Sequence, residues 1–327
     1  MVILSYLISL FGIGFLIFIH ELGHFLFCKL FKIPAPKFAI GIGPKIFSKK
    51  HKGTEYSIGI IPISGYVQIG EEQENESDVH VLYQHSWIKG TLVTFGGIIF
   101  NLFFAYIAIT SVILWNSQYI MESNLKSFAP QKNIILEDKE NNQIILNYHS
   151  SIEMLQKIKK DKFILEDSDG EEIIFENEKF FIDNFTIKYD FMTIPETFIE
   201  KIVFSIKMTN NIIHQSVTGI INLFKGANFS NFSGPIGIIK SLETAVQKSY
   251  VDFFIFLSLV SISLAVINLV PIPMLDGGQF LFLTIYKILG RGVPEKIQNL
   301  LLYASLGLII IMTLFSTYND ILRVFFS

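Results

Sequence analysis

The sequence has 327 residues, of which 50% are hydrophobic, and its mean hydropathy is +0.47. Water-soluble domains of this length are rarely so apolar, so the composition indicates an integral membrane protein. The net charge of −3 and the scattered basic residues argue against nucleic-acid binding, and the single cysteine, Cys28, excludes an internal disulfide and a cysteine-based zinc finger.

The first predicted membrane span, Val2–Phe27, contains the sequence His20-Glu21-Leu22-Gly23-His24. A hydrophobic stretch of this length can cross a bilayer as a helix. Two histidines four residues apart project from the same face of a helix, where both imidazoles can bind one Zn²⁺ ion. Glu21 lies beside them and is expected to act as general base toward a water that the metal activates. Ionisable side chains are costly within a span, so the motif indicates a functional site.

Residues Thr54–Gly70 combine β-branched residues with glycine and proline, which predicts a β-hairpin or a re-entrant β-loop. Irregular backbone at membrane depth must be buried in protein or line a cavity, so such a loop would lie near the active site. A surface hairpin is the alternative interpretation. An edge strand from Tyr56 to Ile69 could pair with an extended substrate by β-addition. The candidate substrate-binding residues are therefore Tyr56, Ile58, Gly65 and Tyr66.

The second predicted span, Thr91–Trp115, carries Asn101 near its middle. A side-chain amide is costly in lipid and needs a partner. Asn101 could donate a hydrogen bond to the oxyanion of an acyl-transfer reaction, but a structural contact between helices is the simpler interpretation.

Residues 116–195 are more polar and predict a small, mostly β domain. A helix-like stretch, Ser151–Lys160, interrupts its strands. Thr197–Lys225 then has apolar residues at near-helical spacing, which predicts an amphipathic helix, either on the membrane surface or packed on the β domain. The predicted strands are Asn133–Leu136, Gln143–Asn147, Phe163–Leu165, Glu172–Phe175 and Phe180–Ile182.

The third predicted span, Phe253–Leu275, is followed directly by Asp276, the best candidate for a third zinc ligand. Catalytic zinc sites use three protein ligands and one open position. Pro271 and Pro273 interrupt the span, and a carboxylate at this depth is costly unless a cation neutralises it. Asn268 lies just before the break and either stabilises the reaction's oxyanion or satisfies freed backbone groups.

The fourth predicted span is Leu300–Ser316, and the charges between the spans predict the topology. Lysines are frequent between Cys28 and Gly90, and Lys287, Arg291 and Lys296 follow the third span. Both segments are expected to face the cytoplasm. Both termini and residues 116–250 would then be extracytoplasmic, with the active site toward the cytoplasmic side.

Together these motifs resemble the site-2 protease family of intramembrane zinc metalloproteases, peptidase family M50, and in particular its bacterial RseP-type branch, the regulator of sigma-E protease. The resemblance covers residues 1–115 and 230–327. Besides the HExxH helix, the matching segments are Phe38–Pro44, Pro62–Val67, Gly96–Asn101, Ser233–Gly237 and Asn268–Gly277.

The resemblance implies an α-helical integral membrane protein with four transmembrane helices, a membrane-associated β-loop and a small, mostly β extracytoplasmic domain. It implies that His20, His24 and Asp276 bind zinc and that Glu21 is catalytic. Residues 1–115 and 251–327 would form the two halves of the protease core. Residues 116–195 would be a PDZ-like or degenerate PDZ domain, and residues 196–250 an amphipathic membrane-surface segment.

By the same resemblance, the protein would be a zinc metalloendopeptidase of a bacterial inner membrane that performs regulated intramembrane proteolysis. Its partners would be the lipid bilayer, single-span substrates such as anti-sigma factors or remnant signal peptides, and a site-1-type protease that acts first. The alternatives are a catalytically inactive homologue and a zinc-binding membrane scaffold or transporter. The intact Glu21 and the gathering of ionisable residues at one place favour the protease. The ligand types are also compatible with other divalent metals.

Overall fold

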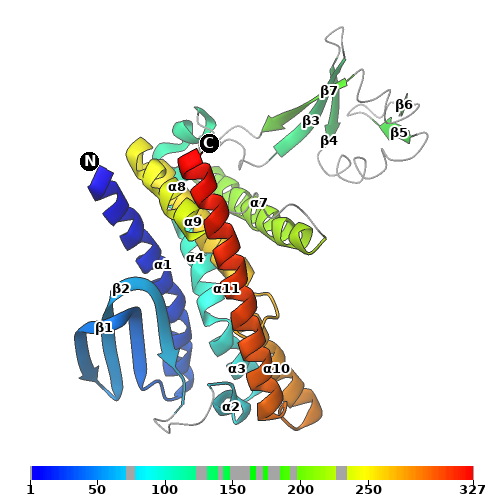
Figure 1. The fold of residues 1–327 in the computed structure, drawn as a ribbon. Coiled ribbons are helices and arrows are strands. Elements are labelled where there is room, and N and C mark those ends of the chain that lie inside the picture. The colour runs from blue at the N-terminus through cyan, green and yellow to red at the C-terminus, as the bar shows by residue number, and fades with distance from the viewer. Residues whose placement is uncertain are drawn as a thin grey trace. The chain divides into compact units, whose positions relative to one another are not determined.

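The chain forms two compact units in the computed structural model, residues 1–112 with 212–327, and residues 113–211. Figure 1 shows the elements in chain order. The described residues are 2–70, 78–122, 131–138, 143–147, 163–166, 172–175, 185–191, 197–225 and 234–326. The predicted helix Ser151–Lys160 and the predicted strand Phe180–Ile182 lie outside them.

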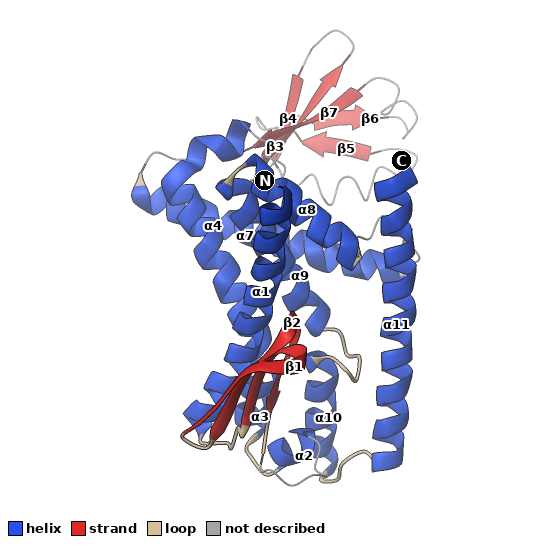
Figure 2. Ribbon diagram, turned by 60° about the vertical axis from the view of Figure 1, so that its left-hand side comes forward, coloured by secondary structure: helices blue, strands red, loops and turns tan. Residues whose placement is uncertain are grey.

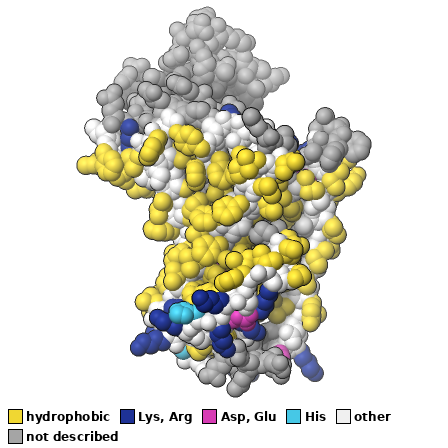
Figure 3. All heavy atoms as spheres, turned by 90° about the vertical axis from the view of Figure 1, so that its left-hand side faces the viewer, with side chains coloured by type: hydrophobic (Ala, Val, Ile, Leu, Met, Phe, Trp, Pro, Cys, Tyr) yellow, Lys and Arg dark blue, Asp and Glu magenta, His cyan; other side chains and the backbone are white. Residues whose placement is uncertain are grey.

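Among the described residues, four helices are long and apolar enough to cross a bilayer, which confirms the four predicted spans. Hydrophobic side chains form a broad belt over the face drawn in Figure 3. The protein is therefore a multi-pass membrane protein. The four helices are α1 (Val2–Phe31), α4 (Gly96–Glu122), α9 (Tyr250–Asn268) and α11 (Glu295–Phe326).

The third predicted span ends earlier than the hydrophobic pattern suggested. Helix α9 stops at Asn268, and turns follow until α10 (Asp276–Leu289) begins. Pro271 and Pro273 explain the break, because proline cannot donate a backbone hydrogen bond and disfavours helix in the residue before it. Asp276 thus stands at the start of a new helix rather than after a continuous span.

The predicted start of the second span, Thr91, was also too early in the sequence. Thr91–Thr94 belong to the short helix α3 (Trp87–Thr94), and α4 starts at Gly96. At its other end the helical backbone is interrupted at Asn116, which has φ −145° and ψ 55°. This interruption lies next to Trp115, the predicted end of the span.

Strands β1 (Lys37–His51) and β2 (Thr54–Gln68) form a bent sheet in which each strand pairs twice. Phe38 pairs with Tyr56 on one side and with Val67 on the other, while Lys49 pairs with Tyr56 from the far half of β1. Residues 54–58 therefore lie in the interior of the sheet and residues 65–68 form an edge. Gly41, with φ 84°, allows β1 to bend away from its first partner.

The predicted edge strand Tyr56–Ile69 is consequently wrong for Tyr56 and Ile58. Ile58 pairs with Ile40 and also with Phe47, so both of its sides are occupied. The sequence shows which residues favour a strand. It did not reveal that β1 pairs with residues 54–58 on both sides, because the glycines and lysines of β1 are not typical of a buried strand.

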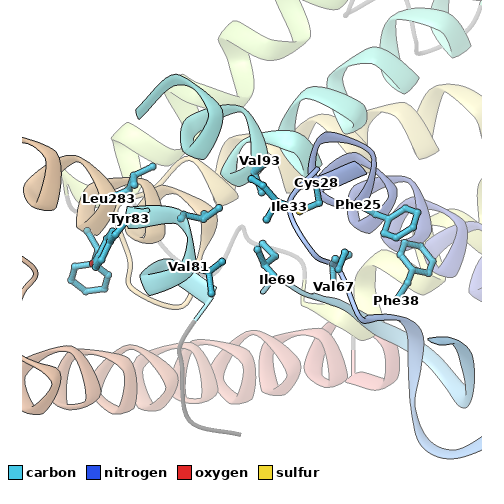
Figure 4. Close-up of a cluster of buried hydrophobic side chains, with 13 residues drawn as sticks. Phe25, Cys28, Ile33, Phe38, Val67, Ile69, Val81, Tyr83, Val93 and Leu283 are labelled. Atoms are coloured by element: carbon cyan, nitrogen blue, oxygen red, sulfur yellow. The ribbon is translucent and has the colours of Figure 1, made fainter. Parts of the chain in front are cut away.

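A single hydrophobic cluster joins the sheet to the helices at one end of the first unit. Figure 4 shows Phe25 and Cys28 of α1 facing Phe38 and Val67 of the sheet, and the cluster continues to Leu283 of α10. The short helices α2 (Asp78–Tyr83) and α3 supply Val81, Tyr83 and Val93. This core holds α1, the sheet and α10 together on the side of the predicted site.

Helix α8 (Pro235–Lys248) receives its N-terminal cap from α11. Its own N-cap residue, Gly234, makes no side-chain capping bond, and the backbone N–H of Gly237 donates to Oδ2 of Asp320 at 2.7 Å. A buried carboxylate at a helix N-terminus satisfies free N–H groups and the helix dipole. Figure 2 shows α11 as one long helix beside the bundle, so Asp320 fastens it to α8.

In the second unit, three strands form an antiparallel sheet in the order β4-β3-β7, and two more form a hairpin. These strands confirm four of the predicted ones and add β7, which sequence reasoning missed. Helix α7 (Phe198–Phe224) confirms the predicted helix and begins with a capping box between Thr197 and Glu200. The strands are β3 (Gln131–Asp138), β4 (Gln143–Asn147), β5 (Phe163–Glu166), β6 (Glu172–Phe175) and β7 (Phe185–Phe191).

Two glycines allow α1 to approach the start of α4 at backbone distance. A Cβ atom built on Gly23 would lie 2.1 Å from the carbonyl oxygen of Gly96, and one built on Gly96 would lie 2.6 Å from the backbone of Gly23. No other residue type fits at either position without moving a helix. The glycine inside the HExxH motif therefore sets how close the two helices come.

Gly23→Ala is expected to lower the free energy of unfolding by about 1–3 kcal/mol, the usual range for overpacking. Gly307→Ala on α11 is the matched control, because its added methyl group meets nothing within 4 Å. Alanine there should be neutral or stabilising by about 0.5–1 kcal/mol, since glycine weakens helices. Thermal unfolding in detergent measures both changes. A Gly23→Ala midpoint equal to that of Gly307→Ala would contradict the close contact.

Candidate metal centre

The side chains of His20, His24 and Asp276 converge, although Asp276 lies more than 250 positions away in the sequence. Nε2 of His24 is 3.3 Å from Nε2 of His20. Oδ2 of Asp276 is 3.4 Å from Nε2 of His20 and 3.6 Å from Nε2 of His24. Among the described residues, this is the one group of three histidine, cysteine or acidic side chains whose ligand atoms lie within 4.8 Å of one another.

The outer nitrogen of each imidazole already has a neighbour that orients the ring. Nδ1–H of His24 donates to the carbonyl oxygen of Val93 at 2.8 Å, so Nε2 of the neutral ring carries a lone pair. The ring of His20 lies against Gly97, where a Cβ atom would be 2.4 Å from Cε1. Such outer contacts fix the tautomer and the orientation of metal-binding histidines.

Asn101 is a second neighbour of His20. Its Nδ2 lies 3.2 Å from Nδ1 of His20, while its buried Oδ1 has no hydrogen-bond partner among the described residues. Exchanging the two amide atoms gives Oδ1 a donor, because Nδ1–H of His20 can then donate to it. Asn101 also receives a hydrogen bond at its carbonyl oxygen from Ser261 of α9, at 2.9 Å. Its position supports the interhelical interpretation made from the sequence.

The three ligand atoms fit a zinc ion. Atoms bound to zinc at 2.0–2.2 Å and tetrahedral angles lie about 3.3–3.6 Å from one another. The three measured separations, 3.3, 3.4 and 3.6 Å, all fall within this range. Two imidazole nitrogens facing a buried carboxylate oxygen that lacks a hydrogen-bond donor among the described residues form a suitable site for a cation.

The break after α9 brings Asp276 to the histidines. Gly277 and Gly278 pack against the turn before them, where a Cβ atom would lie 2.3 Å from the carbonyl oxygen of Leu269 and 2.2 Å from that of Ile272. Close packing at these two glycines fixes where α10 starts, and with it the position of the carboxylate.

An aromatic stack holds α10 further along its length. The ring of Tyr286 in α10 lies parallel to the ring of Tyr83 in α2, with the ring centroids 4.0 Å apart. Nζ of Lys287, the next residue, donates to the carbonyl oxygen of Tyr83 at 2.7 Å. Helix α10 is thus held at its start by glycines and in its body by its contacts with α2.

A cavity of about 180 Å³ opens beside His20. Glu21 lines it, and its carboxylate lies near the backbone N–H of Val67, in the edge segment of β2. Asn268, the last residue of α9, places Nδ2 3.5 Å from Nε2 of His20. The remaining lining residues are Ile17, His20, Ser64, Gly65, Asn101 and Leu264.

The other candidate substrate-binding residues have different surroundings. Gly65 lines the cavity, and a Cβ atom there would lie 2.8 Å from Cγ of Glu21. Tyr56 instead packs against Phe25 and Phe38 in the hydrophobic cluster. Ile58 and Tyr66 are exposed and do not line the cavity.

Sequence reasoning missed the backbone partners of the site. Val67 and Val93 contribute an N–H and a carbonyl group, and Gly97 contributes the space for the His20 ring. Nearly every residue carries the same backbone N–H and carbonyl groups, so the sequence does not show which of them contact the site. Gly97 alone gave a signal, as a glycine inside a predicted span.

Comparison with known proteins gives a consistent family. The model of the family described as "Peptidase family M50" matches residues 8–312. A protein of Fusobacterium nucleatum is 30% identical over 98% of this chain and all of its own length. Relatives from Campylobacter jejuni and Clostridium acetobutylicum are 27% and 28% identical, over 98% and 96% of this chain and 94% and 96% of their own lengths. All three carry the name "Putative zinc metalloprotease".

Asp276→Asn is expected to release zinc under dialysis against a chelator that leaves the wild-type protein loaded, because the neutral amide is a weaker ligand than the carboxylate. Asp252→Asn is the matched control, since Asp252 is equally buried but pairs with Lys248 at the start of α9. Metal analysis of the dialysed proteins measures the difference. Equal zinc in both variants would remove Asp276 from the ligand set.

Proposed function

Because this chain belongs to peptidase family M50, the site-2 protease family, and is a zinc metalloprotease, we propose that it hydrolyses peptide bonds within or near the membrane spans of single-span proteins. The observation that carries the proposal is the position of the candidate centre. His20 and His24 lie on a helix of bilayer length, and the cavity beside them is lined by two more spans. A protease with this arrangement meets its substrate at membrane depth.

In this proposal His20, His24 and Asp276 hold the zinc ion. When bound, zinc supplies Lewis-acid chemistry, lowering the pKa of a water to about 7 and polarising the scissile carbonyl. Glu21 accepts a proton from the attacking water on its carboxylate and passes it to the leaving amine nitrogen. The backbone N–H of Val67 lies near that carboxylate at the cavity wall.

Asn268 is the candidate for stabilising the oxyanion of the tetrahedral intermediate. Its Nδ2 group borders the cavity and lies 3.5 Å from a ligand atom of His20. A donor fixed beside developing negative charge lowers the barrier most effectively in a site that excludes water. Asn101 acts one step removed, by orienting the His20 ring.

The free edge of the β1–β2 sheet, residues 65–68, could bind an extended substrate by strand pairing. Transmembrane substrates are helical, so their backbone amides must exchange partners before cleavage. Residues 65–68 have one neighbour in the sheet, and Ser64 and Gly65 line the cavity. A substrate segment that pairs beside Gly65 would lie next to Glu21. The proposed substrate-pairing segment, residues 65–68, is therefore shorter than the strand Tyr56–Ile69 expected from the sequence.

The distribution of charge supports a location in a bacterial inner membrane with the active site toward the cytoplasm. Lys and Arg side chains gather at one margin of the hydrophobic belt in Figure 3, and the β1–β2 sheet and the connection after α10 are both rich in basic residues. Short basic connections remain on the cytoplasmic side during insertion. Both termini and residues 116–250 would then be extracytoplasmic.

The substrates would be anti-sigma factors or remnant signal peptides that a site-1-type protease has already trimmed. The small β unit would be a PDZ-like or degenerate PDZ domain that hinders substrates with bulky ectodomains. Its described part is the three-stranded β4-β3-β7 sheet with the β5–β6 hairpin. Removing a substrate's ectodomain before cleavage fits a cavity that has room for only a few side chains.

Cleavage of a model single-span substrate in detergent tests the proposed function. Glu21→Gln keeps the shape of the side chain but removes the base, so cleavage should fall by about 10²–10⁴-fold. Zinc content should stay at the wild-type value. Mass spectrometry of the products should place the cut within or beside the apolar segment. A cut confined to the soluble flank, or equal rates for both proteins, would contradict the proposal.

Gly65→Ala tests the substrate edge. The added methyl group would meet Glu21 and the carbonyl oxygen of Ala39 at 2.8 and 3.1 Å, so the edge and the base must shift. We expect cleavage to fall about 10–100-fold with zinc retained, as for other small displacements at active sites. Gly292→Ala is the control, because its methyl group would meet only ring atoms at 3.4 Å or more. Unchanged cleavage by Gly65→Ala would show that the edge has no part in catalysis.

A further inference from the structure

The outer part of the β1–β2 sheet carries large apolar side chains that nothing in its own unit covers. Phe38, Tyr56 and Val67 pack toward α1 in the hydrophobic cluster. Beyond them, Ile46 and Phe47 are 66% and 51% exposed. Others exposed in the same sheet are Ile42, Ile58, Ile60 and Ile61. Contiguous exposed apolar side chains mark a binding surface or a contact with lipid.

The same end of the sheet is strongly basic. Residues 37–57 contain five lysines and a single acid, Glu55. Glu55 is already engaged, because it accepts hydrogen bonds from Lys45 at 2.5 Å and from Ser48 at 2.7 Å. The hydrogen bonds from Lys45 and Ser48 lower the pKa of Glu55, so its carboxylate stays ionised and bound to these two residues. Lys49 and Lys52 are exposed and have no ion pair with any acid in the described part of the chain.

From this juxtaposition we propose that the end of the sheet around residues 45–52 binds the headgroups of anionic phospholipids. Apolar side chains next to lysines match a membrane interface, where the chains contact acyl groups and the ammonium groups contact phosphate. Figure 3 shows Lys and Arg side chains directly at the margin of the hydrophobic belt, which is where headgroups lie. An acidic protein partner would not account for the exposed isoleucines.

The surface is connected to the candidate metal centre through the sheet. Lys49 pairs with Tyr56, Tyr56 pairs with Phe38, and Phe38 pairs with Val67. The backbone N–H of Val67 lies near the carboxylate of Glu21. Lipid bound around residues 45–52 would therefore stabilise the sheet, whose opposite edge lies beside Glu21. Binding itself does not depend on proteolysis and can be measured without a substrate.

The thermal midpoint of the full-length protein in neutral detergent measures the binding, because a ligand of the folded state raises it. Dioleoylphosphatidylglycerol should stabilise the wild type, and dioleoylphosphatidylcholine should not. The variant Lys49→Gln/Lys50→Gln/Lys52→Gln should bind phosphatidylglycerol about 100-fold more weakly, at about 1 kcal/mol per lysine. Added salt should weaken the wild-type effect.

Two variants make the result specific. Lys201→Gln/Lys207→Gln/Lys225→Gln, on α7 and directly after it, removes the same charge elsewhere and should keep the lipid effect. The arginine version, Lys49→Arg/Lys50→Arg/Lys52→Arg, should also keep it, which separates loss of charge from a folding defect. Glycerol 1-phosphate should not stabilise the protein, since it lacks acyl chains. Equal stabilisation of the glutamine variant of the sheet, or no preference for phosphatidylglycerol, would overturn the proposal.

Discussion

The structure depends on bringing two imidazoles and one carboxylate together inside an apolar helix bundle. In such surroundings an uncompensated carboxylate costs several kcal/mol, and lone pairs that face it repel it. A bound zinc ion removes both penalties. The close backbone contact of Gly23 with Gly96 positions α1 against α4, and the glycines after Asp276 position the start of α10, so candidate ligands from α1 and α10 lie close enough to share one ion.

The rest of the first unit holds these ligands in place. The hydrophobic cluster packs α1 on the sheet and on α2, α3 and α10, so the helix with the histidines and the helix with the carboxylate share one core. The carbonyl oxygen of Val93 then fixes one imidazole, and the backbone of Val67 lies near the candidate base. Helix α11 is fastened at its far end by Asp320 and contributes no residue to the cavity.

The sequence was sufficient where the signal is local. The HExxH spacing and the proline break predicted that His20, His24 and Asp276 act together, and their side chains converge; hydrophobic length predicted the four spans. It was insufficient to predict which strands pair when they are distant in the sequence, because a strand's neighbours depend on the whole fold. Tyr56 was therefore expected at an edge and lies inside the sheet. Strand β7 was missed even though Phe185, Ile187, Tyr189 and Phe191 alternate with polar residues.

The most direct test of the metal centre is zinc X-ray absorption of the wild type and of Asp276→Cys. The wild type should show only nitrogen and oxygen ligands, because its single cysteine, Cys28, is not part of the ligand cluster. Asp276→Cys should add one sulfur atom at about 2.3 Å from zinc. A variant that binds zinc without a sulfur ligand would show that position 276 does not reach the metal, and would contradict the account.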